Sequence, residues 1–168
     1  MPATYEPIAT TTLSSAASTI TFSSIGSGYT DLRVIFSGLG TTGAGQYANM
    51  RLNSDTGTNY SNTRFKVSGT SIISQRTSGI TSIWLMDNYE LNSTIPTFCT
   101  ADIFSYAGST NKTALVTESN EMNSASSGLT RFVSLWRNTA AITSITLFTT
   151  SGNFAIGTTA TLYGILKA

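Results

Sequence analysis

The stretch Asp31-Leu32-Arg33-Val34-Ile35-Phe36-Ser37 carries the clearest structural signal in the sequence. In an extended chain Leu32, Val34 and Phe36 fall on one side, because successive side chains of a β-strand point to opposite faces. The charged and hydroxyl side chains of the stretch fall on the other side. This alternation predicts a strand that has one face in a core and one face in solvent.

Similar short runs, separated by clusters of Gly, Asn, Ser and Asp, recur along the whole chain and predict ten or eleven strands. They are Ser18–Ser23, Asp31–Ser37, Ala48–Asn53, Thr63–Val67, Ser71–Arg76, Ile80–Met86, Thr97–Tyr106, Lys112–Glu118, Leu129–Trp136, Ile142–Thr149 and Thr159–Leu166. No segment has the apolar spacing of a long helix, and Glu118–Ser127 has room for one helical turn at most.

These elements predict an all-β fold, a jelly-roll-like antiparallel β-sandwich that forms a single domain over residues 1–168. Residues 1–15 are expected to form an extended N-terminal arm, placed to reach across a neighbouring subunit. The strand Thr97–Tyr106 is apolar on both faces, with Cys99 on one and Phe98, Phe104 and Tyr106 on the other. It is therefore expected to be central in its sheet and to contact another subunit with its second face.

The composition favours surfaces that make contacts. Charged residues are 10% of the chain, against about 25% in an average soluble domain, and 24 serines and 30 threonines take their place. The net charge is +1, and no basic cluster marks a nucleic-acid site. No signal peptide and no apolar run of membrane-spanning length is seen. We therefore expect no nucleic-acid partner and no membrane partner.

This sequence lacks residues that many enzymes use for catalysis. The sequence has no histidine and one cysteine, Cys99, so it offers no Ser-His-Asp triad, no Cys-His dyad and no usual zinc site. Cys99 is interpreted as a small buried residue. The run Gly38–Gly43 fits G-x-G-x-x-G, but a strand-like stretch follows it where a dinucleotide site needs a helix. It is interpreted as a loop.

Paired carboxylates are the remaining route to catalysis, as in a glycosidase. Asp102 stands out because it lies in an apolar strand, and we interpret it as satisfied by a nearby arginine or by backbone amides. Asp87 and Glu90 could bind a cation or a sugar, but they are interpreted as solvated turn residues. Asp55 lies in a turn and could contribute to a calcium site, although no EF-hand pattern is present.

Trp84 and Trp136 could stack on sugars, but both lie in strand-like runs, which favours packing in the core or at an interface. With these interpretations the sequence predicts no catalytic, cofactor-binding or metal-binding residues, and a protein that is not an enzyme. Catalysis on carbohydrates by paired carboxylates such as Asp102 and Asp87 stays as a minor alternative.

Seven stretches over nearly the whole chain resemble small virion proteins of tailed bacteriophages, notably cyanophages and other marine phages. They are Tyr5–Leu13 (YEPIATTTL), Ile20–Ile25, Tyr29–Leu32, Arg51–Ser61 (RLNSDTGTNYS), Leu135–Leu147 (LWRNTAAITSITL), Gly152–Phe154 and Leu162–Ile165. Proteins of this kind are described as capsid decoration, tail-fibre or virion structural proteins. The resemblance implies a component of the phage particle and brings no catalytic residues with it.

Two functions follow as hypotheses. The first is a capsid decoration, or cement, protein that binds the major capsid protein or other virion proteins, forms a homotrimer and stabilises the head shell. Such a protein would be assembled in the host cytoplasm and located in the virion. The second is a tail-fibre or receptor-binding protein that grips glycans on the host surface with Tyr- and Asn-bearing loops.

Overall fold

The computed structural model describes residues 4–42, 45–86, 90–120 and 128–166, and these form an antiparallel β-sandwich. The all-β prediction is therefore confirmed. No helix long and apolar enough to cross a membrane occurs in the described ranges. The strands are β1 (Tyr5–Thr12), β2 (Thr19–Phe22), β3 (Asp31–Gly38), β4 (Ala48–Leu52), β5 (Tyr60–Ser68), β6 (Ser71–Ile80), β7 (Ile83–Trp84), β8 (Thr97–Phe104), β9 (Lys112–Asn120), β10 (Gly128–Trp136), β11 (Ile145–Thr149) and β12 (Thr159–Ile165).

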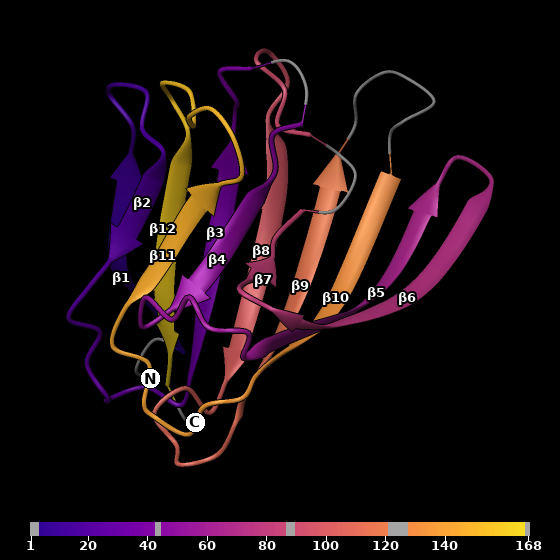
Figure 1. Ribbon diagram of the computed structural model, residues 1–168. Helices are drawn as coiled ribbons and strands as arrows, with labels where there is room; N and C mark the ends of the chain where they lie inside the picture. The colour runs from indigo at the N-terminus through magenta and orange to yellow at the C-terminus, as the bar shows by residue number, and fades with distance from the viewer. Residues whose placement is uncertain (1–3, 43–44, 87–89, 121–127, 167–168) are drawn as a thin grey trace.

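Eight of these strands form a jelly roll. β1 pairs with β12, β2 with β11, β3 with β8 and β4 with β7, always antiparallel. Such nested pairs arise when one long hairpin is wrapped into two facing sheets, which here have the orders β1-β12-β3-β8 and β2-β11-β4-β7 (Figure 1). This is the double-sheet arrangement of a jelly roll.

Two inserted hairpins make one sheet twice as wide as the other. The hairpin β5–β6 lies in the connection from β4 to β7, and the hairpin β9–β10 lies between β8 and β11. Because β9 pairs with β8 and β10 with β5, the order continues as β8-β9-β10-β5-β6. We call β9, β10, β5 and β6 the extension. Figure 1 shows its β5–β6 end flaring away from the sandwich.

The core lies between the two sheets. Leu32, Val34 and Phe36 of β3 are buried as their alternation predicts, and Phe36 packs against Phe154 with ring centroids 5.3 Å apart. Under the extension, β7 contacts β10 and β5. The inward side chains of β9 and β10 are accordingly buried, although the second sheet ends at β7.

The central strand behaves largely as its sequence indicates. β8 lies between β3 and β9, with Cys99 buried, whereas Phe98 and Phe104 point outward and are 43% and 44% exposed. The assignment of Tyr106 to their side was wrong. Tyr106 lies beyond the end of β8, is fully buried in the core, and donates a hydrogen bond to the carbonyl of Gly26 at 2.5 Å.

Several boundaries differ from those expected from the sequence. Residues 5–12, expected as part of the extended arm, form the edge strand β1 in this chain's own sheet. The run 80–86 holds the last residue of β6, Ile80, and the two-residue strand β7, and 142–149 begins its strand at Ile145. Of the stretch considered for a helical turn, residues 118–120 belong to β9, and 121–127 lie outside the described residues.

Gly164 gives a test of the packing at the β12 edge of the core. A Cβ built at this position would come within 2.3 Å of the Tyr29 ring. We expect Gly164→Ala to lower the free energy of unfolding by about 2 kcal/mol, because overpacking forces neighbouring groups to move. Gly28→Ala is the matched control, since nothing lies within 4 Å of its Cβ position. Urea unfolding that ranked the two variants equally would contradict this account.

Candidate functional site

The outer face of the extension is the best candidate for a functional surface. It is the face turned away from the second sheet, and it is formed by alternate residues of the four strands. The register places Leu115 opposite Val133, Val133 opposite Thr63, and Phe65 opposite both Arg131 and Ser74. These side chains therefore form two neighbouring rows that run across the strands.

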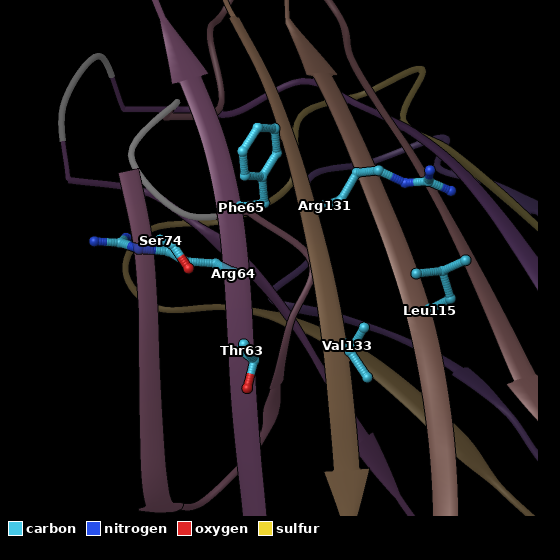
Figure 2. Close-up of a pocket in the computed structure, with 7 residues that line it drawn as sticks. All are labelled: Thr63, Arg64, Phe65, Ser74, Leu115, Arg131 and Val133. Carbon is cyan, nitrogen blue, oxygen red and sulfur yellow. The ribbon is translucent and has the colours of Figure 1, made fainter. Parts of the chain in front are cut away.

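The two rows enclose a shallow hollow, which Figure 2 shows in close-up. Its volume is about 330 Å³. Its lining consists of Thr63, Arg64, Phe65, Ser74, Leu115, Arg131 and Val133. Leu115, Val133 and Phe65 give it an apolar part, and the hydroxyl groups of Thr63 and Ser74 and the guanidinium group of Arg131 give it polar atoms that can bind a partner. The Arg64 side chain belongs to the opposite face of the sheet, where its Nη2 donates to Gln75 Oε1.

Apolar side chains are exposed on this face well beyond the hollow. Phe65 is 49% and Val133 54% exposed, and Leu129 and Ile72 are exposed as well. Isolated exposed apolar side chains are normal, but a contiguous group of them marks an interaction surface. Phe98 and Phe104 of the neighbouring β8 continue the apolar surface toward the centre of the sheet.

The charge of this face is positive and uncompensated within the described residues. Arg76 and Arg131 are exposed, and neither forms an ion pair with a carboxylate that the structure describes. The outward positions of the four strands hold no aspartate or glutamate in the described ranges. A partner that carries carboxylate groups beside apolar groups would therefore match this surface.

Asp102, the most conspicuous carboxylate of the sequence, is engaged by an arginine. It faces Arg33 across the β3–β8 pair, where Arg33 Nη2 donates to Asp102 Oδ2 at 2.8 Å and Arg33 Nε donates to Oδ1. The hydrogen bond to Asp102 is the main cause that raises the pKa of Arg33. The interpretation of Asp102 as a carboxylate satisfied by a nearby arginine agrees with this geometry.

Asp55 organises the turn between β4 and β5. Its carboxylate accepts hydrogen bonds from the Gly57 amide at 2.8 Å, from Asn59 Nδ2 at 2.9 Å and from Trp136 Nε1 at 2.7 Å. Burial opposes the charged form, but these three bonds, with that from Trp136 foremost, lower the pKa of Asp55. Its oxygens thus serve the turn and the Trp136 ring.

The two tryptophans have packing roles. Trp136 is buried and stacks on Tyr60, with ring centroids 6.2 Å apart and an angle of 17° between the planes. Trp84 is half-buried against the core. Neither ring is presented as an open stacking platform for a sugar.

The remaining candidates do not assemble into a site. Asp87 lies outside the described residues, as do Gly43 and Ala44 of the glycine-rich run. Glu90 accepts a hydrogen bond from the Tyr47 hydroxyl at 3.4 Å, and Cys99 is a buried free thiol. Within the described ranges, no three His, Cys, Asp or Glu side chains are placed to hold a metal ion.

A buried polar row crosses the inner face of the sheet, and nothing in the sequence pattern pointed to it. Glu118 lies opposite Thr130, which lies opposite Lys66, and all three are buried. Burial raises the pKa of Glu118 to about 8. The hydrogen bond with Thr130 and the charge of Lys66 lower this pKa, but by less than burial raises it. Burial also lowers the pKa of Lys66. Because solvent does not reach these groups, they are unsuited to act on a substrate.

The outer face could have been found from one strand. In β10, Leu129, Val133 and Leu135 alternate with Phe132 and Trp136, so both faces of the strand are apolar in part. That pattern indicates a strand with a second contact surface, as was inferred for β8.

Comparisons of the chain with models of protein families, with curated proteins and with solved structures gave no match.

Proposed function

We propose that this chain is a structural protein of a bacteriophage particle that works by contact rather than catalysis, as a capsid decoration protein on the head shell. One observation carries the proposal, namely the broad outer face of the extension, with its exposed Phe65, Leu129 and Val133. In this proposal that face binds the major capsid protein or another virion protein. The eight strands of the jelly roll are the rigid support on which the face is built.

The physical chemistry of the face supports such a role. Burying its apolar side chains would contribute to binding at about 25 cal/mol per Å². Arg76 and Arg131, which form no ion pair with the carboxylates that the structure describes, would select a partner that carries carboxylates. Many copies bound to one lattice would multiply weak individual contacts. Jelly rolls occur in viral capsid proteins and in lectins, so the fold is compatible with the proposal but does not establish it.

The test uses heads from particles in which the protein is deleted. We expect such heads to rupture at a lower temperature, and added protein to restore the wild-type value. Val133→Glu, which places a charge on the apolar face, is expected to abolish the rescue, whereas Ile156→Glu, at an exposed apolar residue outside the extension, retains it. Unchanged rupture of the deleted heads would overturn the cementing role.

A receptor-binding role is the second candidate, and the hollow of Figure 2 favours it. The exposed Phe65 ring lies in the same row as Ser74 and Arg131, and the Arg131 guanidinium extends away from the ring, toward β9 (Figure 2). The ring could stack on a sugar, and the guanidinium could bind an acidic group farther along the same glycan. In that case particles without the protein would keep their head stability and fail to adsorb to the host. Copy number separates the two roles, because a decoration protein that binds throughout the shell lattice is expected in many more copies than a fibre protein.

A further inference from the structure

Strand β6 is an open edge of the large sheet. It is the last strand of the sheet, its one strand partner among the described residues is β5, and eight of its ten residues are exposed. Since alternate residues of an antiparallel strand turn their N–H and C=O groups to opposite sides, about half of its backbone groups are without a strand partner. Such an edge is a template for another strand.

The opposite edge of the same sheet is blocked. β1 contains Pro7, which has no N–H to donate, and its register shifts between Pro7 and Ala9. Proline and irregular register are the usual protections of an edge strand. From Ser71 to Ser78, β6 has no proline, no register shift and no acidic residue, and the one shift in its register with β5 lies at Gly79, an extra residue of β6 near the end of the strand. Of these two edges, β6 is the one left open.

The sequence of β6 is compatible with pairing to itself. The two-residue loop Gly69-Thr70 makes Ser68–Ser71 the closing hydrogen-bonded pair. Counting from this pair, the backbone groups at the free edge belong to alternate residues, beginning at Ile72 and including Ser74 and Arg76. If two copies pair antiparallel about Ser74, Arg76 lies opposite Ile72 of the partner subunit, and no like charges face each other.

We propose that β6 of one copy pairs antiparallel with β6 of a second copy around a two-fold axis near Ser74. The large sheet would then run on through the dimer, with eight strands from each copy. A second copy is the favoured occupant because a two-fold interface needs one self-complementary strip, which β6 provides. The inference goes beyond the proposed function and does not depend on it, and it gives a dimer where the sequence predicts a trimer.

The test is the solution mass of the purified full chain by light scattering over a wide concentration range, with twice 17.8 kDa expected. Ile72→Lys would place the new lysine opposite Arg76 of the partner subunit twice per dimer, which should weaken association about tenfold. Adding Arg76→Glu turns both repulsions into attractions and should restore the dimer. Ile156→Lys is the matched control, since Ile156 is 64% and Ile72 68% exposed.

Hydrogen exchange gives a second readout, in which the amides of Ser74 and Arg76 should exchange more slowly as the protein concentration rises. Circular dichroism would establish that every variant is folded, which is expected because β6 is exposed. A monomeric or trimeric mass, an undiminished dimer in Ile72→Lys, or a failure of Arg76→Glu to restore it would each overturn the proposal.

Discussion

Replacing Trp136 with alanine is expected to lower the free energy of unfolding by about 4 kcal/mol, the cost of removing a buried tryptophan. The ring is fully buried, stacks on Tyr60, and donates a hydrogen bond to Asp55 at 2.7 Å. Its loss leaves a cavity and removes one of the three bonds that hold the carboxylate of the turn. Because a domain of this size is stable by only about 5–15 kcal/mol, the variant should be close to unfolding.

Two further variants separate packing from hydrogen bonding at this site. Trp136→Phe keeps an aromatic ring beside Tyr60 and loses only the N–H donor and part of the volume, so it should cost about half as much. Trp84→Ala removes a tryptophan that is only half-buried and should also cost less. Urea unfolding followed by circular dichroism ranks the three, and a Trp136→Ala protein as stable as wild type would contradict the assigned role.

The stability of the protein should fall as the pH rises from about 5 to 8, and Glu118 is the reason. The pKa of Glu118 is raised from 4.5 to about 8 in the folded protein. Between these values the native state keeps a proton that the unfolded chain has released, so raising the pH favours unfolding. The full effect is on the order of 5 kcal/mol, reached once the pH exceeds the folded pKa.

Glu118→Gln isolates this effect, because glutamine resembles the neutral acid and does not titrate. Its unfolding free energy should stay nearly flat over the same pH range, so the two curves should diverge as the pH rises. The lowered pKa of Asp55 has the opposite effect, because it makes the stability fall as the pH falls, but only toward and below pH 3.8. The lowered pKa of Lys66 affects the free energy of unfolding only at higher pH, as the pH approaches 10.5. Parallel curves for wild type and Glu118→Gln would show that Glu118 is charged when buried.

The local pattern of the sequence was sufficient for the strands but not for their order. The alternation around Val34 predicts a strand because burial of one face leaves a period of two in the side chains. Pairing between β1 and β12 depends on contacts between distant parts of the chain, and no local pattern encodes it. Residues 5–12 illustrate this, since their edge position becomes evident only from their pairing with β12.

The candidate site shows the same limit. The apolar outward side of β8 was predictable from Phe98 and Phe104, and the pairing of Asp102 with an arginine was a reasonable expectation from burial alone. Phe65 and Leu115 lie on the same face, but this could be seen only from the register of the three neighbouring strands β5, β10 and β9. The buried Glu118 was not anticipated, because an isolated glutamate in a polar stretch normally points to solvent.

The nested strand pairing has a consequence for how the chain acquires its structure during synthesis. The β5–β6 hairpin closes through a two-residue turn, so it can form as soon as that segment leaves the ribosome. By contrast β1 must wait for β12, its strand partner in the described part of the chain, which is synthesised much later than β1. Distant pairing of this kind makes folding slow. The nascent chain should therefore expose apolar strands until β12 has been synthesised, a stage at which chaperones protect against aggregation.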